Sequence, residues 1–159
     1  MEQKYIYSFS QIEDKVKALH ETNTEAAAAV ALSWLGLSRD ELKTLRVSDY
    51  NSTMRMLHSA GRVVYVREDL IADMLKAICE EAPEYSMGFF ITDVNSAYET
   101  AEKQELSPIS VLKMRYFYEK HSAKLSGEPE DRVFLKEILR SVGESEADME
   151  KQFAEYEKD

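Results

Sequence analysis

Arginine and lysine side chains concentrate in two segments of a chain that is acidic as a whole. Its 159 residues include 20 Lys or Arg and 30 Asp or Glu, which gives a formal net charge of −10. Residues 36–67 hold six basic against three acidic side chains, and residues 107–127 hold four against one. If both segments fold onto one face, they form a positive patch that can neutralise several phosphates. The alternative is that these cations lie on ordinary solvated faces of helices and strands.

Metal, cofactor and thiol chemistry have little support in the residue pattern. His20, His58 and His121 fall in three different predicted elements and no cysteine cluster accompanies them, so we predict no metal site. Cys79 has no neighbouring histidine that would activate its thiol, and we expect a structural role for it. A Gly-rich phosphate loop is also missing, and we expect no cofactor.

The composition favours a cytoplasmic protein. A single cysteine cannot form an internal disulfide, which fits a reducing compartment. The first ten residues contain no apolar signal region. The longest nearly apolar run, residues 26–37, is too short to span a bilayer. We therefore expect a cytoplasmic protein that does not associate with membranes.

Helix signals dominate the chain and predict a mainly α protein with a small antiparallel sheet, the α+β class. Ser10 with Glu13, and Ser38 with Glu41, have the spacing of a capping box. Ser107-Pro108 starts a long helix, and Asp93 or Asn95 starts a shorter one. We predict further helices over residues 24–35, 68–81, 133–142 and 146–158, a β-hairpin from residues 53–59 and 62–67, and a third strand over residues 88–91.

The length and the lack of a long linker predict a single domain over residues 1–159. Its last helix, within residues 145–159, carries Met149, Phe153 and Tyr156 at positions i, i+4 and i+7. This apolar stripe either packs back onto the domain or binds a second copy or another protein.

Residues 28–50 resemble the first conserved block of the tyrosine recombinases, or phage integrases. In that family an apolar helix precedes a Gly-Leu, a Glu-Leu and a Leu-Arg pair, and a hairpin follows. This chain has Gly36-Leu37, Glu41-Leu42 and Leu45-Arg46 in the same order. Residues 106–108 and 139–145 are similar to later family segments. The resemblance covers nearly the whole chain and implies the fold of the family's catalytic domain.

The catalytic residues of that family do not carry over. The first arginine position falls on Ser38, and in residues 110–114, where the family has His-x-x-Arg-His, Lys113 alone keeps a charge. The late histidine falls on Glu144, and the tyrosine nucleophile falls nearest Phe153, three residues before Tyr156. Loss of even one transition-state donor typically lowers a rate about 10²–10³-fold. The resemblance therefore implies a protein that is not an enzyme and has no catalytic residues.

A non-catalytic protein of this kind is similar to phage lytic-cycle repressors, which implies a DNA-binding regulator of transcription. We expect it to contact the phosphate backbone through the two basic segments. The chain starts where the family's catalytic domain starts, without the N-terminal half of the DNA clamp, so we expect weak and salt-sensitive binding of double-stranded DNA. The predicted DNA-binding residues are Arg39, Lys43, Arg46, Arg62, Lys113, Arg115 and Lys120.

The alternative function is a protein-interaction module on the same fold. Such a module would use its acidic surface to bind or inhibit a host or phage protein, and the net charge of −10 is its main support. The arrangement of the two basic segments distinguishes these functions. Convergence on one face favours DNA, and opposite faces favour a protein partner.

Overall fold

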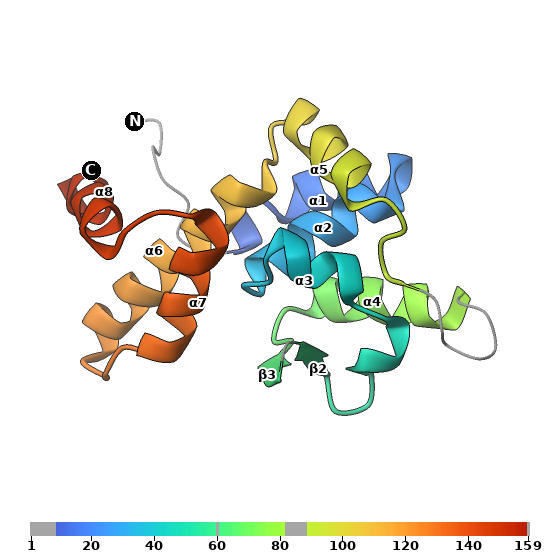
Figure 1. The fold of residues 1–159 in the computed structure, drawn as a ribbon, viewed down its shortest axis with the longest axis horizontal. Coiled ribbons are helices and arrows are strands. Elements are labelled where there is room, and N and C mark those ends of the chain that lie inside the picture. The colour runs from blue at the N-terminus through green and yellow to red at the C-terminus, as the bar shows by residue number, and fades with distance from the viewer. Residues whose placement is uncertain (1–8, 60, 82–88, 159) are drawn as a thin grey trace.

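The computed structural model describes residues 9–59, 61–81 and 89–158, with residues 156–158 described by their backbone only. The fold is mainly helical with a small three-stranded antiparallel sheet, as the sequence predicts (Figure 1). In chain order the elements are η1 (Phe9–Gln11), α1 (Glu13–Thr22), α2 (Thr24–Trp34), α3 (Arg39–Thr44), η2 (Val47–Asp49), β1 (Tyr50–Asn51), β2 (Met56–Ser59), β3 (Arg62–Tyr65), α4 (Asp69–Glu81), α5 (Val94–Lys103), α6 (Pro108–Ser126), α7 (Arg132–Val142) and α8 (Glu146–Lys158).

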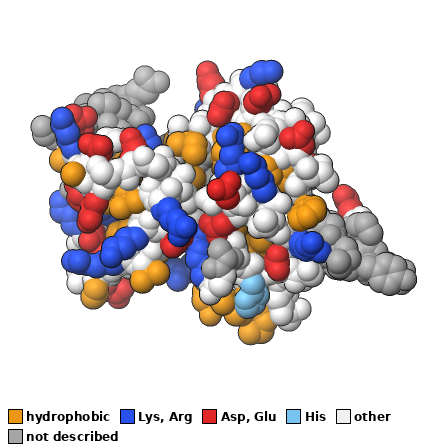
Figure 2. All heavy atoms as spheres, in the orientation of Figure 1, with side chains coloured by type: hydrophobic (Ala, Val, Ile, Leu, Met, Phe, Trp, Pro, Cys, Tyr) orange, Lys and Arg blue, Asp and Glu red, His pale blue; other side chains and the backbone are white. Residues whose placement is uncertain are grey.

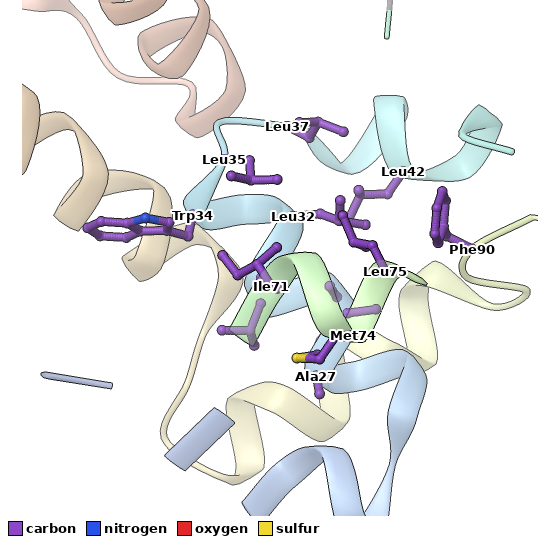
Figure 3. Close-up of a cluster of buried hydrophobic side chains, with 14 of the residues drawn as sticks. Ala27, Leu32, Trp34, Leu35, Leu37, Leu42, Ile71, Met74, Leu75 and Phe90 are labelled. Atoms are coloured by element: carbon purple, nitrogen blue, oxygen red, sulfur yellow. The ribbon is translucent and has the colours of Figure 1, made fainter. Parts of the chain in front are cut away.

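Helix α2 is the centre of the larger hydrophobic core. Every side chain from Ala26 to Trp34 is buried, and α1, α5 and α6 pack around the helix. Alanine favours the helix, and its short side chain lets neighbouring helices approach closely. Figure 3 shows how Leu32 of α2 lies beside Leu42 of α3 and Leu75 of α4 in this core. The predicted helix over residues 24–35 is therefore confirmed as a buried one.

The sheet has the order β1-β2-β3, and its second and third strands form the predicted hairpin. Leu57 pairs with Val64, and both side chains point into the core. The prediction of a third strand over residues 88–91 is wrong in its location. The third strand is the two-residue β1, while Phe89 forms only an isolated bridge with Arg46 and Gly88 lies outside the described residues.

Local capping signals predicted most helix starts correctly. Ser38 and Glu41 form the full capping box of α3, Ser107 caps α6, and Asp93 rather than Asn95 caps α5. The predicted start at Ser10 is wrong, because α1 begins at Glu13 after a short 3₁₀ turn. In this turn Phe9 and Ile12 are buried, so core packing determines the entry into α1.

A second hydrophobic cluster joins the C-terminal half of α6 to α7 and α8. We call residues 112–158 the C-terminal lobe and the described residues from 9 to 111 the N-terminal lobe; Figure 1 shows α7 and α8 together on one side of the molecule. Met149 and Phe153 of α8 are buried, and the Phe153 ring stacks on Phe117 of α6 at 6.1 Å between centroids. The C-terminal stripe thus packs on its own chain at these two residues, while the side chain of Tyr156 lies outside the described residues.

The two lobes meet at the end of α2. Gly36 has a φ of +96°, and a β-carbon built on it would lie 2.6 Å from the Phe134 ring of α7. Only a glycine combines this left-handed backbone with such a close approach. Gly36 therefore positions α7 against the N-terminal lobe.

We expect Gly36→Ala to destabilise the protein more than Gly143→Ala does. Both glycines have positive φ, but nothing lies within 4 Å of a β-carbon on Gly143. Gly143→Ala therefore reports the backbone cost alone, about 1 kcal/mol. Gly36→Ala adds overpacking against Phe134, typically about 1–3 kcal/mol more. Urea unfolding of both variants measures the difference, and equal losses would contradict the close contact at Gly36.

No described helix has both the length and the apolar character needed to cross a membrane.

Candidate nucleic-acid interface

Arg62 of β3 lies in a half-buried ion pair with Glu41 of α3. Its Nη2 donates to both carboxylate oxygens of Glu41, at 2.9 and 3.0 Å, and to the carbonyl of Gly36 at 3.0 Å. Ser59 of β2 donates to the same carboxylate at 2.7 Å. This network ties the hairpin to α3, so the charge of Arg62 is used inside the fold.

Glu41 is held in its charged form by these donors. Burial raises the pKa of Glu41, but the hydrogen bonds from Ser38, Ser59 and Arg62 outweigh this effect and leave the pKa below its ordinary value. A carboxylate with a lowered pKa in the folded state stabilises the fold above its unfolded pKa, about 4.3. That contribution is lost as the pH falls through the folded pKa.

We expect Glu41→Gln to lower the free energy of unfolding by about 2–3 kcal/mol at pH 7, because Arg62 loses its carboxylate partner. The difference from the parent protein should shrink below about pH 4, where the parent carboxyl also becomes protonated. Urea unfolding at both pH values measures it. Glu21→Gln, at an exposed position of α1, is the control. An equal loss at both pH values would contradict a charge-dependent network.

Arg115 of α6 joins the two lobes and is also used internally. Its Nη1 donates to the carbonyl of Trp34 at 2.8 Å, and its Nε donates to Glu119 at 2.8 Å. The guanidinium lies 4.9 Å from the ring centroid of Phe134 and 5.3 Å from that of Trp34. These contacts leave Arg115 little freedom to bind a phosphate.

Lys113 and Lys120 of α6 are paired with carboxylates. Lys113 Nζ lies 3.0 Å from Glu144, and Lys120 Nζ lies 3.1 Å from Glu130 and also pairs with Glu150 of α8. Burial lowers the pKa of Lys120, but its carboxylate partners outweigh this and raise the pKa above its ordinary value. Tyr116, beside the pair, has its pKa raised to about 12, mainly by burial.

The remaining three predicted residues lie on or next to α3. Arg39 and Lys43 are exposed and stand one helical turn apart, and the Arg39 guanidinium stacks on the Tyr98 ring at 4.3 Å. Arg46 follows the helix, where its guanidinium lies 5.3 Å from the Phe89 ring. Arg39 and Lys43 thus present charge to solvent.

Sequence reasoning missed a row of cations on α7. Arg132, Lys136 and Arg140 follow one another at i, i+4 and i+8, and all three are exposed. Their spacing places them within one face of the helix. The signal was hidden because residues 128–159 hold eleven acidic against five basic side chains.

One cation of α3, Arg39, and one of α7, Arg140, line a common cavity of about 400 Å³. Ser38 and Ser141 line this cavity with them. Asp40, Glu41 and Glu137 also line it, but the charge of Glu41 is balanced by Arg62. We call the five exposed cations the α3–α7 basic surface: Arg39, Lys43, Arg132, Lys136 and Arg140.

None of these five cations has a carboxylate within ion-pair distance among the side chains of residues 9–59, 61–81 and 89–155. Figure 2 shows Lys and Arg side chains gathered over the C-terminal lobe, with Asp and Glu side chains between them.

The two basic segments predicted from the sequence meet at a different place, where Arg62 and Arg115 line a cavity of about 230 Å³ between β3 and α7. At that meeting point Arg62 and Arg115 already have carboxylate partners, while Arg67 of the first segment lines the same cavity and is exposed.

The remaining candidate side chains lie in surroundings that favour a structural role. Cys79 is half-buried, with Sγ 3.7 Å from the Val47 carbonyl, and burial raises the pKa of its thiol. In the described part of the chain, no three His, Cys, Asp or Glu side chains gather in a way that could hold a metal ion. Two positions that the sequence resemblance led us to compare with catalytic residues have structural partners: Ser38 serves as a helix cap, and Lys113 pairs with Glu144.

Comparison with known proteins gives no match: no family model, no curated protein and no solved structure is significantly similar to this chain. The local geometry is therefore the basis for any assignment of function.

Proposed function

We propose that the protein is a non-catalytic DNA-binding regulator that contacts the phosphate backbone through the α3–α7 basic surface. The observation that carries this proposal is a set of exposed cations on α3 and α7 for which the described side chains supply no carboxylate partner, two of which, Arg39 and Arg140, line one cavity. An exposed cation that is not already paired can release counterions from DNA when it meets a phosphate. Such contacts position a protein on the duplex without reading its sequence.

The resemblance to tyrosine recombinases supports the proposal in one respect. Lys113 and Glu144 are 31 positions apart, yet they form an ion pair, and the resemblance assigns both positions to the same catalytic centre. Ser141, one turn before Glu144, lines the same cavity as Ser38, the position of the first catalytic arginine. Substitution of that centre by serine, lysine and glutamate fits a protein that binds DNA without cleaving it.

The charge arrangement limits the strength of binding. Four of the seven cations predicted as DNA contacts, Arg62, Lys113, Arg115 and Lys120, have carboxylate partners within the fold. A phosphate would have to displace those partners, whereas the α3–α7 basic surface is accessible without any rearrangement. With a net charge of −10 on the whole chain, we expect weak binding that falls steeply with salt.

The triple variant Lys43→Ala/Lys136→Ala/Arg140→Ala tests this surface. We expect weaker binding to a random-sequence duplex of about 30 base pairs, and a slope of log K against log salt that is smaller by about three units. Fluorescence anisotropy at several salt concentrations measures both quantities.

The matched control is Lys15→Ala/Lys17→Ala/Lys103→Ala, which removes three exposed cations from α1 and α5. It changes the net charge by the same amount, so a specific surface predicts little change in slope for the control. An unchanged slope in the first variant, or an equal change in both, would remove the α3–α7 basic surface from consideration.

A protein-interaction module is the second candidate, and a different observation favours it. Val63 and Tyr65 on the outer face of β3 are 43% and 60% exposed, and Val133 of α7 is 75% exposed. All three line the cavity between β3 and α7. Exposed apolar side chains around a cavity are typical of a partner-binding site. If the protein does not bind the duplex even at low salt, the cavity between β3 and α7 becomes the candidate site for a protein partner. Tyr65→Ala is the variant that tests this site.

A further inference from the structure

Carboxylates from the C-terminal lobe cover two cations of α6. Glu144, in the turn before α8, pairs with Lys113, and Glu150 of α8 pairs with Lys120. Glu130, in the turn before α7, supplies a second partner for Lys120 at 3.1 Å. The side chains of Lys113 and Lys120 are only 30% and 11% exposed. The ammonium groups of both lysines are thus already paired with carboxylates, which occupy the position that the phosphate of a bound nucleic acid would take.

Lys113 and Lys120 lie on the same side of α6. They are seven residues apart, which is close to two full helical turns, so their side chains project in similar directions. Exposed together, they would form a pair of cations along one helix face. The three carboxylates cover this pair, and we call Glu130, Glu144 and Glu150 the masking carboxylates.

One of the masked lysines, Lys120, adjoins the α3–α7 basic surface. Lys120 lines a cavity of about 280 Å³ with Arg132 and Lys136 of that surface. Glu130 and Glu150 line the same cavity. Two of the masking carboxylates, Glu130 and Glu150, therefore lie beside cations of both α6 and α7, and they lower the positive potential that a nucleic acid would meet there.

We propose that the masking carboxylates act as intramolecular substitutes for phosphate and restrain DNA binding by this protein. The inference rests on the proposed function, since it concerns regulation of the same surface. A duplex that contacts Lys113 or Lys120 must first displace a carboxylate, so these lysines add little affinity while they are paired. Removing the negative charge makes them available for additional phosphate contacts.

The position of α8 does not depend on these charges alone. Met149 and Phe153 bury their side chains against α6, and the Tyr116 hydroxyl donates to Glu150 at 3.2 Å. A glutamine at position 150 retains an oxygen that accepts this hydrogen bond. Charge removal therefore tests masking without removing the helix, whereas deletion of α8 would expose the apolar face of α6.

The test is the triple variant Glu130→Gln/Glu144→Gln/Glu150→Gln, titrated into a labelled random-sequence duplex at several salt concentrations. We expect tighter binding at low salt, and a slope of log K against log salt that is steeper by about two units, one for each uncovered lysine. Adding Lys113→Ala and Lys120→Ala to this variant should abolish the gain in slope. Thermal unfolding followed by circular dichroism shows whether each variant is folded.

The matched control is Glu21→Gln/Glu99→Gln/Glu155→Gln, which neutralises three exposed carboxylates on α1, α5 and α8. An equal gain in this control would mean that net charge alone is responsible, and would overturn masking. If the parent protein binds DNA through the α3–α7 basic surface but the masking variant behaves like the control, masking fails while the proposed function stands. Absence of binding by every variant at low salt would overturn both.

Discussion

The fold depends on the complete burial of α2. Because every side chain from Ala26 to Trp34 is buried, α1, α5 and α6 must pack around this helix. The end of α2 also places the C-terminal lobe, since the Trp34 carbonyl accepts a hydrogen bond from Arg115 of α6. Gly36, two residues later, admits the Phe134 ring of α7. The separation between α3 and α7, and hence the basic surface they share, follows from these contacts.

Some charged side chains of this protein hold its elements together, and others face the solvent. Arg62 and Arg115 hold the hairpin and the lobes together through carboxylate and carbonyl partners. Such half-buried pairs are costly to break because the remaining charge loses its partner. Arg39 and Lys43 on α3 and the cations of α7 are exposed, and although Arg39 stacks on Tyr98, their charge remains available to an anion. An acidic chain can thus retain a local positive surface.

Local signals predicted the helices well and the site only in part. Ser38, Asp93 and Ser107 cap helices through hydrogen bonds to residues three positions away, so their role is visible in a short stretch of sequence. The two-residue strand β1 has no alternating pattern, and it was missed. Ion pairs such as Glu41 with Arg62 join residues far apart in the chain, and helix and strand patterns do not reveal them. Helical spacing alone was enough to identify the three cations of α7, but the negative net charge of residues 128–159 concealed them.

The most direct test of the account is amide chemical-shift mapping of the protein as a random-sequence DNA duplex is added at low salt. The α3–α7 basic surface predicts that the largest perturbations fall in residues 39–43 and 132–140, and that they disappear as salt is raised. Perturbations confined to α1 and α5, or perturbations of β3 that leave residues 39–43 unchanged, would contradict the account. In that case DNA contacts another surface, and the cations of α3 and α7 are ordinary solvated side chains.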